Sequence, residues 1–335
     1  MKKILVTGGC GYIGSHTIID LIENGFELIS IDNFSNSYAD VLVNLKKITG
    51  KTIKNYNIDL CNLNALKEVF KENTDIDGII HFAALKAVGE SVENPILYYR
   101  NNIDSLLNLL DCCSEFQIKN FVFSSSCSVY GNAEKLPVDE FSALTVSESP
   151  YAETKVMAER IISDFANVNS FNCALLRYFN PIGAHESGFI GENQKGLPQN
   201  IVPRITGTAL GEFSEFKIFG NNYPTIDGTC VRDYIHVSDI AHGHTLAIQW
   251  LFEQTTDVVE VFNMGSGNGV SVLEMVLAFE KSTGQKLNYS FEEKRAGDVI
   301  AIFANNDKAK KILGWQPKKD LNEMMSSAWN WAKKL

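Results

Sequence analysis

The segment Lys3–Gly14, KILVTGGCGYIG, decides the fold of this 335-residue chain. A short apolar run that ends in glycines and passes into an amphipathic stretch is typical of the first strand, turn and helix of a dinucleotide-binding unit. Counted from Gly9 the glycines read G-x-G-x-x-G, and counted from Gly8 they read G-x-x-G-x-x-G. Asp32 ends the next apolar run, 18 residues after Gly14. Such a carboxylate binds a ribose 2′-hydroxyl and repels a 2′-phosphate, so the pattern predicts NAD rather than NADP.

The first half of the chain alternates short apolar runs with amphipathic stretches. Runs too short for helices, separated by helical patterns, indicate βαβ units, and right-handed crossovers then give an α/β fold with a doubly wound parallel sheet of the Rossmann type. We expect strands at Lys3–Thr7, Glu27–Asp32, Lys54–Asp59, Gly78–Ala83, Asn120–Ser125 and Cys173–Asn180. We expect helices at Tyr12–Asn24, Leu63–Glu72, Pro95–Phe116 and Tyr151–Asn167.

The composition of the sequence changes after Pro181. Residues 181–232 are rich in glycine and proline, which predicts loops and a smaller second domain. We therefore divide the chain into an NAD-binding domain, 1–180, and a C-terminal substrate domain, 181–335. Val258–Met264 has the pattern of a further strand, and the sequence leaves open whether it returns to the main sheet.

Composition and charge exclude several functional classes. The formal net charge of −10 opposes binding to a nucleic-acid backbone. No apolar run reaches the ~18 residues of a membrane span, and the start of the chain lacks the pattern of a secretory signal. The seven cysteines form no C-x-x-C, which suits reduced thiols in the cytoplasm. His242 and His244 lack a third partner at ligand spacing, so we expect no metal.

A second pattern predicts a proton-transfer site. The fifth expected strand ends in three serines, the last being Ser126, and a Y-x-x-x-K from Tyr151 to Lys155 begins a later helix. That spacing places the tyrosine and the lysine on one helix face. A phenol with a pKa of ~10 is a poor base, but a nearby lysine cation and an oxidised nicotinamide would lower that pKa toward ~7. Ser126 would then hold a substrate hydroxyl in line for proton transfer to Tyr151.

With these patterns in place, the chain resembles the extended short-chain dehydrogenase/reductase family, and within it the enzymes that invert C4 of UDP-hexoses. Two matching blocks are far more specific than a glycine pattern: Ile80–Glu93, IHFAALKAVGESVE, and Leu175–Ala184, LLRYFNPIGA. The other blocks follow in order along nearly the whole chain: Thr7–His16, Tyr98–Asn102, Asn120–Gly131, Ser149–Lys155, Ile218–Tyr223, Asp227–Asp239 and Arg295–Asp298. The resemblance implies a cytoplasmic, homodimeric isomerase that uses NAD to interconvert UDP-glucose and UDP-galactose through a transient 4-keto sugar.

The resemblance also implies roles for individual residues. Tyr151 is the base, with Lys155 and Ser126 as further catalytic residues that also contact the ligands. The other cofactor contacts, the turn glycines included, are Gly8, Gly11, Tyr12, Ile13, Gly14, Asp32, Asn33, Asn36, Ser37, Asp59, Leu60, Phe82, Ala83, Ala84, Lys86, Asn101 and Phe179. The other substrate contacts are Lys86, Asn180, Asn200, Ile201, Lys217, Ile218, Phe219, Arg232, Arg295, Asp298 and Ile302. Arginines suit a diphosphate because a guanidinium presents a forked pair of donors.

Several alternatives stay open. A nucleotide-sugar 4,6-dehydratase would share the fold, but it needs an acid pair just after the serine strand, where this chain has Cys127 and Ser128. Ile302 stands where the resemblance implies an aromatic residue for plain hexoses and a small residue for a pocket that also admits N-acetylated sugars, so UDP-N-acetylglucosamine and its C4 epimer remain candidates. An enzyme acting on UDP-glucuronate is not fully excluded. A non-catalytic NAD-binding protein is disfavoured because Tyr151 and Lys155 are both present.

Overall fold

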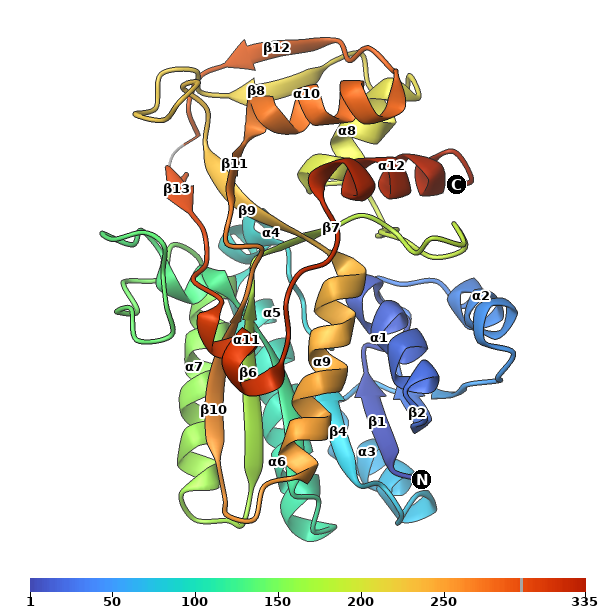
Figure 1. Ribbon diagram of the computed structural model, residues 1–335. Helices are drawn as coiled ribbons and strands as arrows, with labels where there is room; N and C mark the ends of the chain where they lie inside the picture. The colour runs from blue at the N-terminus through green and yellow to red at the C-terminus, as the bar shows by residue number, and fades with distance from the viewer. Residues whose placement is uncertain (296–297) are drawn as a thin grey trace.

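The computed structural model describes residues 1–295 and 298–335, and it shows an α/β body with a smaller region above it (Figure 1). The body is built on a seven-stranded sheet in the order β10-β6-β5-β4-β1-β2-β3, with all neighbours parallel. Its strands are β1 Lys3–Thr7, β2 Glu27–Ile31, β3 Lys54–Tyr56, β4 Gly78–His81, β5 Asn120–Ser126, β6 Asn172–Tyr178 and β10 Val259–Met264. This confirms the predicted doubly wound fold. The strand order reverses between β1 and β4, which is where such sheets bind their ligands.

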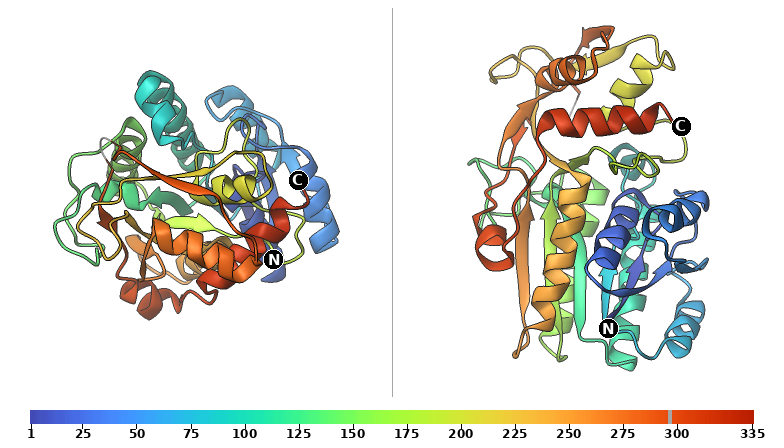
Figure 2. Two further views of the ribbon diagram at one scale, coloured as in Figure 1. Left: turned by 90° about the horizontal axis from the view of Figure 1, so that it is seen from above. Right: turned by 45° about the vertical axis from the view of Figure 1, so that its right-hand side comes forward.

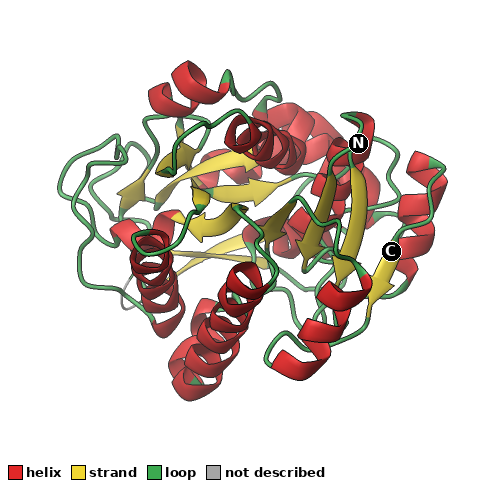
Figure 3. Cartoon of the chain, turned by 90° about the horizontal axis from the view of Figure 1, so that it is seen from below, coloured by secondary structure: helices red, strands yellow, loops and turns green. Residues whose placement is uncertain are grey.

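Helices cover both faces of this sheet, as the view from below shows (Figure 3). On one face lie α1 Tyr12–Glu23, α2 Asp40–Thr49, α9 Val237–Phe252 and α11 Asp307–Leu313. On the other lie α3 Leu63–Glu72, α6 Ser105–Glu115 and α7 Pro150–Ala166. Ile4 and Val6 of β1 pack in the first layer and Leu5 in the second, which explains why the strand reads as an unbroken apolar run.

In the first half of the chain, three helical segments differ from the sequence prediction. The expected helix Pro95–Phe116 consists of α5 Pro95–Tyr99, a π-helical turn η1 Arg100–Asp104, and α6. Such wide turns shift the side chains that follow and occur often at functional sites. The helices α2 and α4 Val88–Glu93 were not predicted. In α2 the buried residue is Leu45, and an apolar face this narrow gives only a weak helical pattern in the sequence.

The upper region has its own sheets and core (Figure 2). The short strands β7 Asn180–Ile182, β9 Val231–His236, β11 Gly269–Ser271 and β13 Ala301–Ile302 form a sheet around β9, while β8 Phe216–Phe219 pairs with β12 Tyr289–Glu292. The helices α8 Ile201–Ala209, α10 Val272–Thr283 and α12 Leu321–Ala332 pack on them. Between these segments, α9 and β10 return to the body, where β10 pairs with β6. In the described ranges, none of the helices has the length and apolarity required to cross a membrane.

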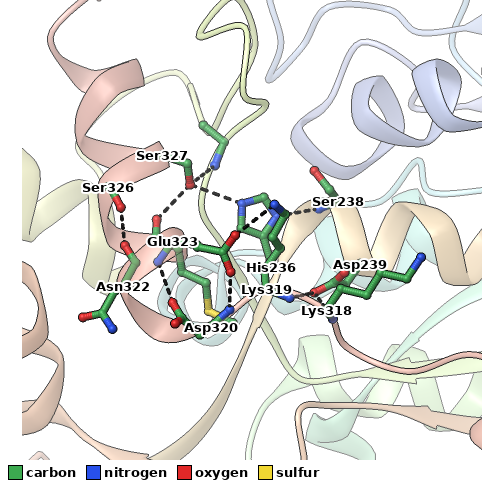
Figure 4. Close-up of polar contacts among 12 residues, drawn as sticks. His236, Ser238, Asp239, Lys318, Lys319, Asp320, Asn322, Glu323, Ser326 and Ser327 are labelled. Carbon is green, nitrogen blue, oxygen red and sulfur yellow. Dashed lines mark hydrogen bonds and ion pairs between the residues drawn. The ribbon is translucent and has the colours of Figure 1, made fainter. Parts of the chain in front are cut away.

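A polar junction fixes α12 against the start of α9 (Figure 4). Ser327 Oγ accepts a hydrogen bond from the Ala184 amide at 3.2 Å and lies 3.2 Å from His236 Nε2. His236 Nδ1 accepts from the Ser238 amide at 3.1 Å, so the ring proton belongs on Nε2 and points at Ser327. Burial lowers the pKa of His236 to about 4, which keeps the ring neutral. The junction therefore joins α12 of the upper region to α9 of the body.

Candidate functional site

A cavity of about 1330 Å³ follows the carboxyl ends of the body strands and extends beneath the upper region. Every site residue predicted from the sequence lines this cavity except Ile218 and Ile302. Ile218 is fully buried in the core of the upper region. Ile302 packs in a small core with Tyr130 and Phe179. The structure thus gathers residues from both halves of the chain around one space.

The glycine turn forms one end of the cavity. Gly8 has φ +68°, and a Cβ added there would lie 2.8 Å from the Ala83 amide nitrogen. A Cβ on Gly14 would lie 2.2 Å from the Gly8 carbonyl oxygen. No side chain caps the start of α1 at Gly11, so the first-turn amides are free to face an anion. This arrangement fits the pyrophosphate of a dinucleotide.

Asp32 is held in place beside that turn. Its Oδ2 accepts a hydrogen bond from the Cys10 amide at 2.9 Å, and its Oδ1 accepts from the Phe34 amide at 2.9 Å and from Ser37 Oγ at 2.7 Å. The carboxylate therefore joins the glycine turn to the loop after β2 while it lines the cavity. An anion at this point fits a ribose with a free 2′-hydroxyl, as NAD has.

A segment from the upper region contacts the same loop, and no pattern in the sequence predicted this contact. Lys195 Nζ donates to the Phe34 carbonyl at 2.6 Å, and its amide donates to Asn36 Oδ1 at 3.1 Å. The ammonium also lies 5.6 Å from the centre of the Tyr38 ring. Neighbouring residues of this segment line the cavity. Lys195 was missed because its partners lie about 160 residues earlier in the chain, where no periodic pattern connects them.

The predicted serine, tyrosine and lysine meet at the middle of the cavity. Ser149 caps α7 by accepting from the Ala152 amide at 3.2 Å, so Tyr151 stands in the first turn of the helix. Lys155 Nζ lies 5.9 Å from the centre of the Tyr151 ring and donates to a backbone carbonyl of β5 at 2.7 Å. Ser126, at the end of the same strand, faces the same space. The three groups therefore have the arrangement needed to move a proton at one substrate hydroxyl.

Burial opposes the charged forms of both Tyr151 and Lys155. Burial raises the pKa of Tyr151 to about 12, although a hydrogen bond with Ser126 acts in the opposite direction. Burial also lowers the pKa of Lys155 to about 8, opposed by the carboxylate of Glu159. The sequence prediction concerns Tyr151 beside a bound, oxidised nicotinamide, and it stays a prediction. The lowering needs positive charge beyond what the chain supplies, and an oxidised nicotinamide carries such a charge.

Cationic side chains surround the other end of the cavity. The Arg295 guanidinium stacks on the Phe219 ring at 3.6 Å, which places it beforehand at the edge of the site. Arg232 lies on β9 and also lines the cavity. Lys217 pairs with Glu292 at 2.8 Å. A protein of net charge −10 thus presents local positive charge that suits a nucleoside diphosphate.

One carboxylate at the site was not foreseen. The Glu192 side chain is 7% exposed and lies 3.5 Å from Lys86 Nζ. Asn200 donates a hydrogen bond to the same carboxylate. Both partners are among the predicted substrate contacts, so Glu192 orders them. Its position in a glycine-rich stretch gave no signal in the sequence.

The two histidines considered for a metal make separate contacts. His242 Nδ1 lies 3.2 Å from Asp20 Oδ2, and His244 Nδ1 contacts the Ile240 carbonyl at 2.9 Å. Across residues 1–295 and 298–335, no group of three or more histidines, cysteines or carboxylates is arranged to hold a metal ion.

Comparison with known proteins gives consistent matches over the whole chain. The family model described as GDP-mannose 4,6 dehydratase matches residues 5–328. A UDP-glucose 4-epimerase of Bacillus subtilis (strain 168) is 47% identical over 329 residues, covering 98% of this chain and 96% of that protein. The solved structure of UDP-glucose 4-epimerase from Bifidobacterium longum, in complex with NAD+ and UDP, has a TM-score of 0.95 at 43% identity and covers 99% of this chain and 98% of its own. The enzyme from Stenotrophomonas maltophila, with bound NAD and formylated UDP-arabinopyranose, has a TM-score of 0.96 at 39% identity, covering 100% and 98%.

Both the matches and the site favour inversion at C4 rather than elimination of water. The family model takes its description from a dehydratase. The curated relatives that cover nearly all of this chain at 44–47% identity are epimerases. After the last serine of β5, the chain continues with Cys127 and Ser128 rather than with the acid pair that elimination of water needs.

Proposed function

This chain belongs to the UDP-glucose 4-epimerase family, and we propose that Ser126, Tyr151 and Lys155 carry out its reaction. The protein is an NAD-dependent isomerase that inverts C4 of a UDP-hexose. The observation that carries the assignment of residues is their meeting in one cavity, between the glycine turn at Gly14 and the cationic end at Arg295. In this proposal the dinucleotide occupies the end at the glycine turn and the UDP group the end at Arg295.

The chain's own residues handle the proton and the orientation of the sugar. NAD, when bound, supplies the hydride acceptor and donor for C4. Ser126 holds the 4-hydroxyl, and Tyr151 takes its proton as C4 becomes a ketone, then returns a proton to the oxygen when the ring has turned over. The Lys155 cation stabilises the phenolate during the interval.

Inversion at C4 requires that the hexose present both faces while the nucleotide stays bound. The stacked Arg295 and Phe219, together with Arg232, supply firm contacts for the uracil and diphosphate end. The hexose end is served by smaller polar side chains such as Asn180 and Ser126. This division lets the sugar rotate about the diphosphate without release of the nucleotide.

Replacing Tyr151 with phenylalanine tests the assignment. The variant should fold and retain NAD but lose turnover by ~10²–10⁴-fold, the usual contribution of a general base. The measurements are the amount of bound NAD and kcat for conversion of UDP-galactose to UDP-glucose. Turnover near that of the unchanged protein would remove Tyr151 from the role.

N-acetylated UDP-hexoses are a second candidate substrate class. Ile302 does not line the cavity, and its side chain packs against Tyr130 and Phe179 instead. Phe179, a member of the same core, does line the cavity. Offering UDP-galactose and UDP-N-acetylgalactosamine separately, and measuring the gluco product of each, decides between the two classes.

The assembly and the location also belong to the proposal. We infer a homodimer, supported by the exposed apolar side chains Val88, Val92, Ile96 and Leu97 on α4 and α5. A mass of one 37.2 kDa chain in solution would contradict it. A cytoplasmic location is supported by the seven free cysteines. A substrate domain after residue 180 is supported by the separate core of the upper region, but α9, β10 and α11 pack with the body and belong to the first domain in this proposal.

A further inference from the structure

A buried ion pair lies directly behind the catalytic group. Glu159 stands one helical turn after Lys155, so Tyr151, Lys155 and Glu159 form a stripe on one face of α7. Arg177 of β6 donates to both oxygens of Glu159, from Nε at 2.9 Å and from Nη2 at 2.6 Å. Ser125 Oγ donates to Glu159 Oε1 at 2.5 Å. The two charged side chains are only 6% and 7% exposed.

The ion pair also connects several strands of the body sheet behind the catalytic group. Arg177 Nη1 donates to the Tyr130 hydroxyl at 3.0 Å, and that hydroxyl donates to Asn263 Oδ1 at 2.6 Å. Asn263 Nδ2 in turn donates to the Val138 carbonyl at 3.0 Å. The network therefore spans β5, β6, α7 and β10, and it leaves the guanidinium hydrogen-bonded on both sides.

We propose that Glu159 is a positioning residue of the epimerase, which keeps Lys155 cationic and anchors the end of β5 through Ser125. The end of β5 carries both the carbonyl that receives the Lys155 ammonium and the Ser126 hydroxyl. The inference rests on the proposed roles of Tyr151 and Lys155.

The charges around Lys155 support this role. From its own helix it faces Tyr151 and Glu159, and from β4 it faces His81, whose pKa burial lowers to about 3. Tyr178 of β6 is buried close to Tyr151, and burial raises its pKa. Of these groups Glu159 is the carboxylate, and the Arg177 cation of β6 pairs with it on the side away from the site. Because burial by itself favours the neutral amine, an anion one turn away keeps the ammonium charged.

The experiment isolates the charge of Lys155. In the holoenzyme, kcat is measured between pH 6 and 10 with Lys155 and with Lys155→Met, and the ratio of the two falls as Lys155 loses its proton. The same ratio is then measured in four variant backgrounds, each with and without Lys155→Met, and the midpoint of its fall is compared. The backgrounds are Glu159→Gln, Ser125→Ala, Arg177→Met and the double variant Glu159→Gln/Arg177→Met. Ser125→Ala is the matched control, since it removes a hydrogen bond of the network and leaves both charges.

Glu159→Gln should move the midpoint down by about one pH unit or more, as expected for loss of a close opposite charge. Ser125→Ala should leave the midpoint in place even if the protein melts at a lower temperature. If Glu159→Gln does not fold, the double variant is compared with Arg177→Met alone, because the two differ only in the charge of Glu159; the midpoint of the double variant should lie lower. A midpoint in Glu159→Gln equal to that of the parent protein, or in the double variant equal to that of Arg177→Met, would overturn the inference. A ratio of one in the parent protein at every pH would instead show that the role of Lys155 is wrong.

Discussion

Replacing Lys155 with methionine should cost about 100-fold in kcat below pH 7. The ammonium lies 5.9 Å from the centre of the Tyr151 ring. At an effective dielectric constant of about 20, a unit charge at that distance stabilises a phenolate by about 3 kcal/mol, or about two pKa units. The methionine side chain keeps the volume of the stem and removes the charge. Tyr151 then ionises less readily at neutral pH by that factor.

The assay follows kcat for UDP-galactose at a series of pH values, with the amount of bound NAD measured in the same samples. The pKa of Lys155 is lowered to about 8, so its charge is present below that pH and lost above it. The gap between the two proteins should therefore narrow toward alkaline pH. Tyr151→Phe gives the lowest kcat expected, since it removes the base itself.

Two results would refute the reasoning. A loss of less than threefold at pH 7 would mean that the ammonium does not support the phenolate. A large loss that stays constant up to pH 10 would mean that Lys155 acts through the hydrogen bond to the Ser124 carbonyl rather than through its charge.

Further predictions concern the cofactor and the stability of the fold. Gly14→Ala places a Cβ against the Gly8 carbonyl, at 2.2 Å, so the variant should lose ~1–3 kcal/mol of stability and its bound NAD, while Gly89→Ala in α4, whose Cβ meets nothing nearer than 3.9 Å, should not lower the stability. Lys195→Ala removes the contacts to the loop after β2, and NAD should dissociate faster in a dilution assay; an unchanged rate would show that the segment does not hold the cofactor. Burial lowers the pKa values of five histidines, so the stability they contribute is complete above pH ~6.5 and falls as the pH drops toward their folded pKa values, by up to ~1.4 kcal/mol per pH unit for each. These are His16 and His81, each with a pKa of about 3, His236 and His244, each with a pKa of about 4, and His185. Urea unfolding at pH 7.5, 6.5 and 5.5 measures the slope, which His236→Gln should reduce; an equal slope in that variant would contradict the prediction.

Local patterns along the chain were enough to predict the body of the fold. Lys3–Thr7 and Leu63–Glu72 were placed with their observed bounds, because buried parallel strands and amphipathic helices have periodicities that neighbouring residues alone create. The glycine turn was predictable for a related reason, since its close approaches exclude any side chain. The π-helical turn was not predicted, since a helix with one wide turn has the same apolar pattern as a regular one.

The charges of the site were decided by the tertiary structure. The sequence placed Tyr151 and Lys155 on one helix face, but burial from all sides, which raises one pKa and lowers the other, depends on how β5, β6 and α7 pack. Glu192 and Lys195 act through partners that are distant in the chain. Periodicity reports which face of an element is buried. The electrostatic environment of a group depends on every charge within a few ångströms, and only the folded chain sets those distances.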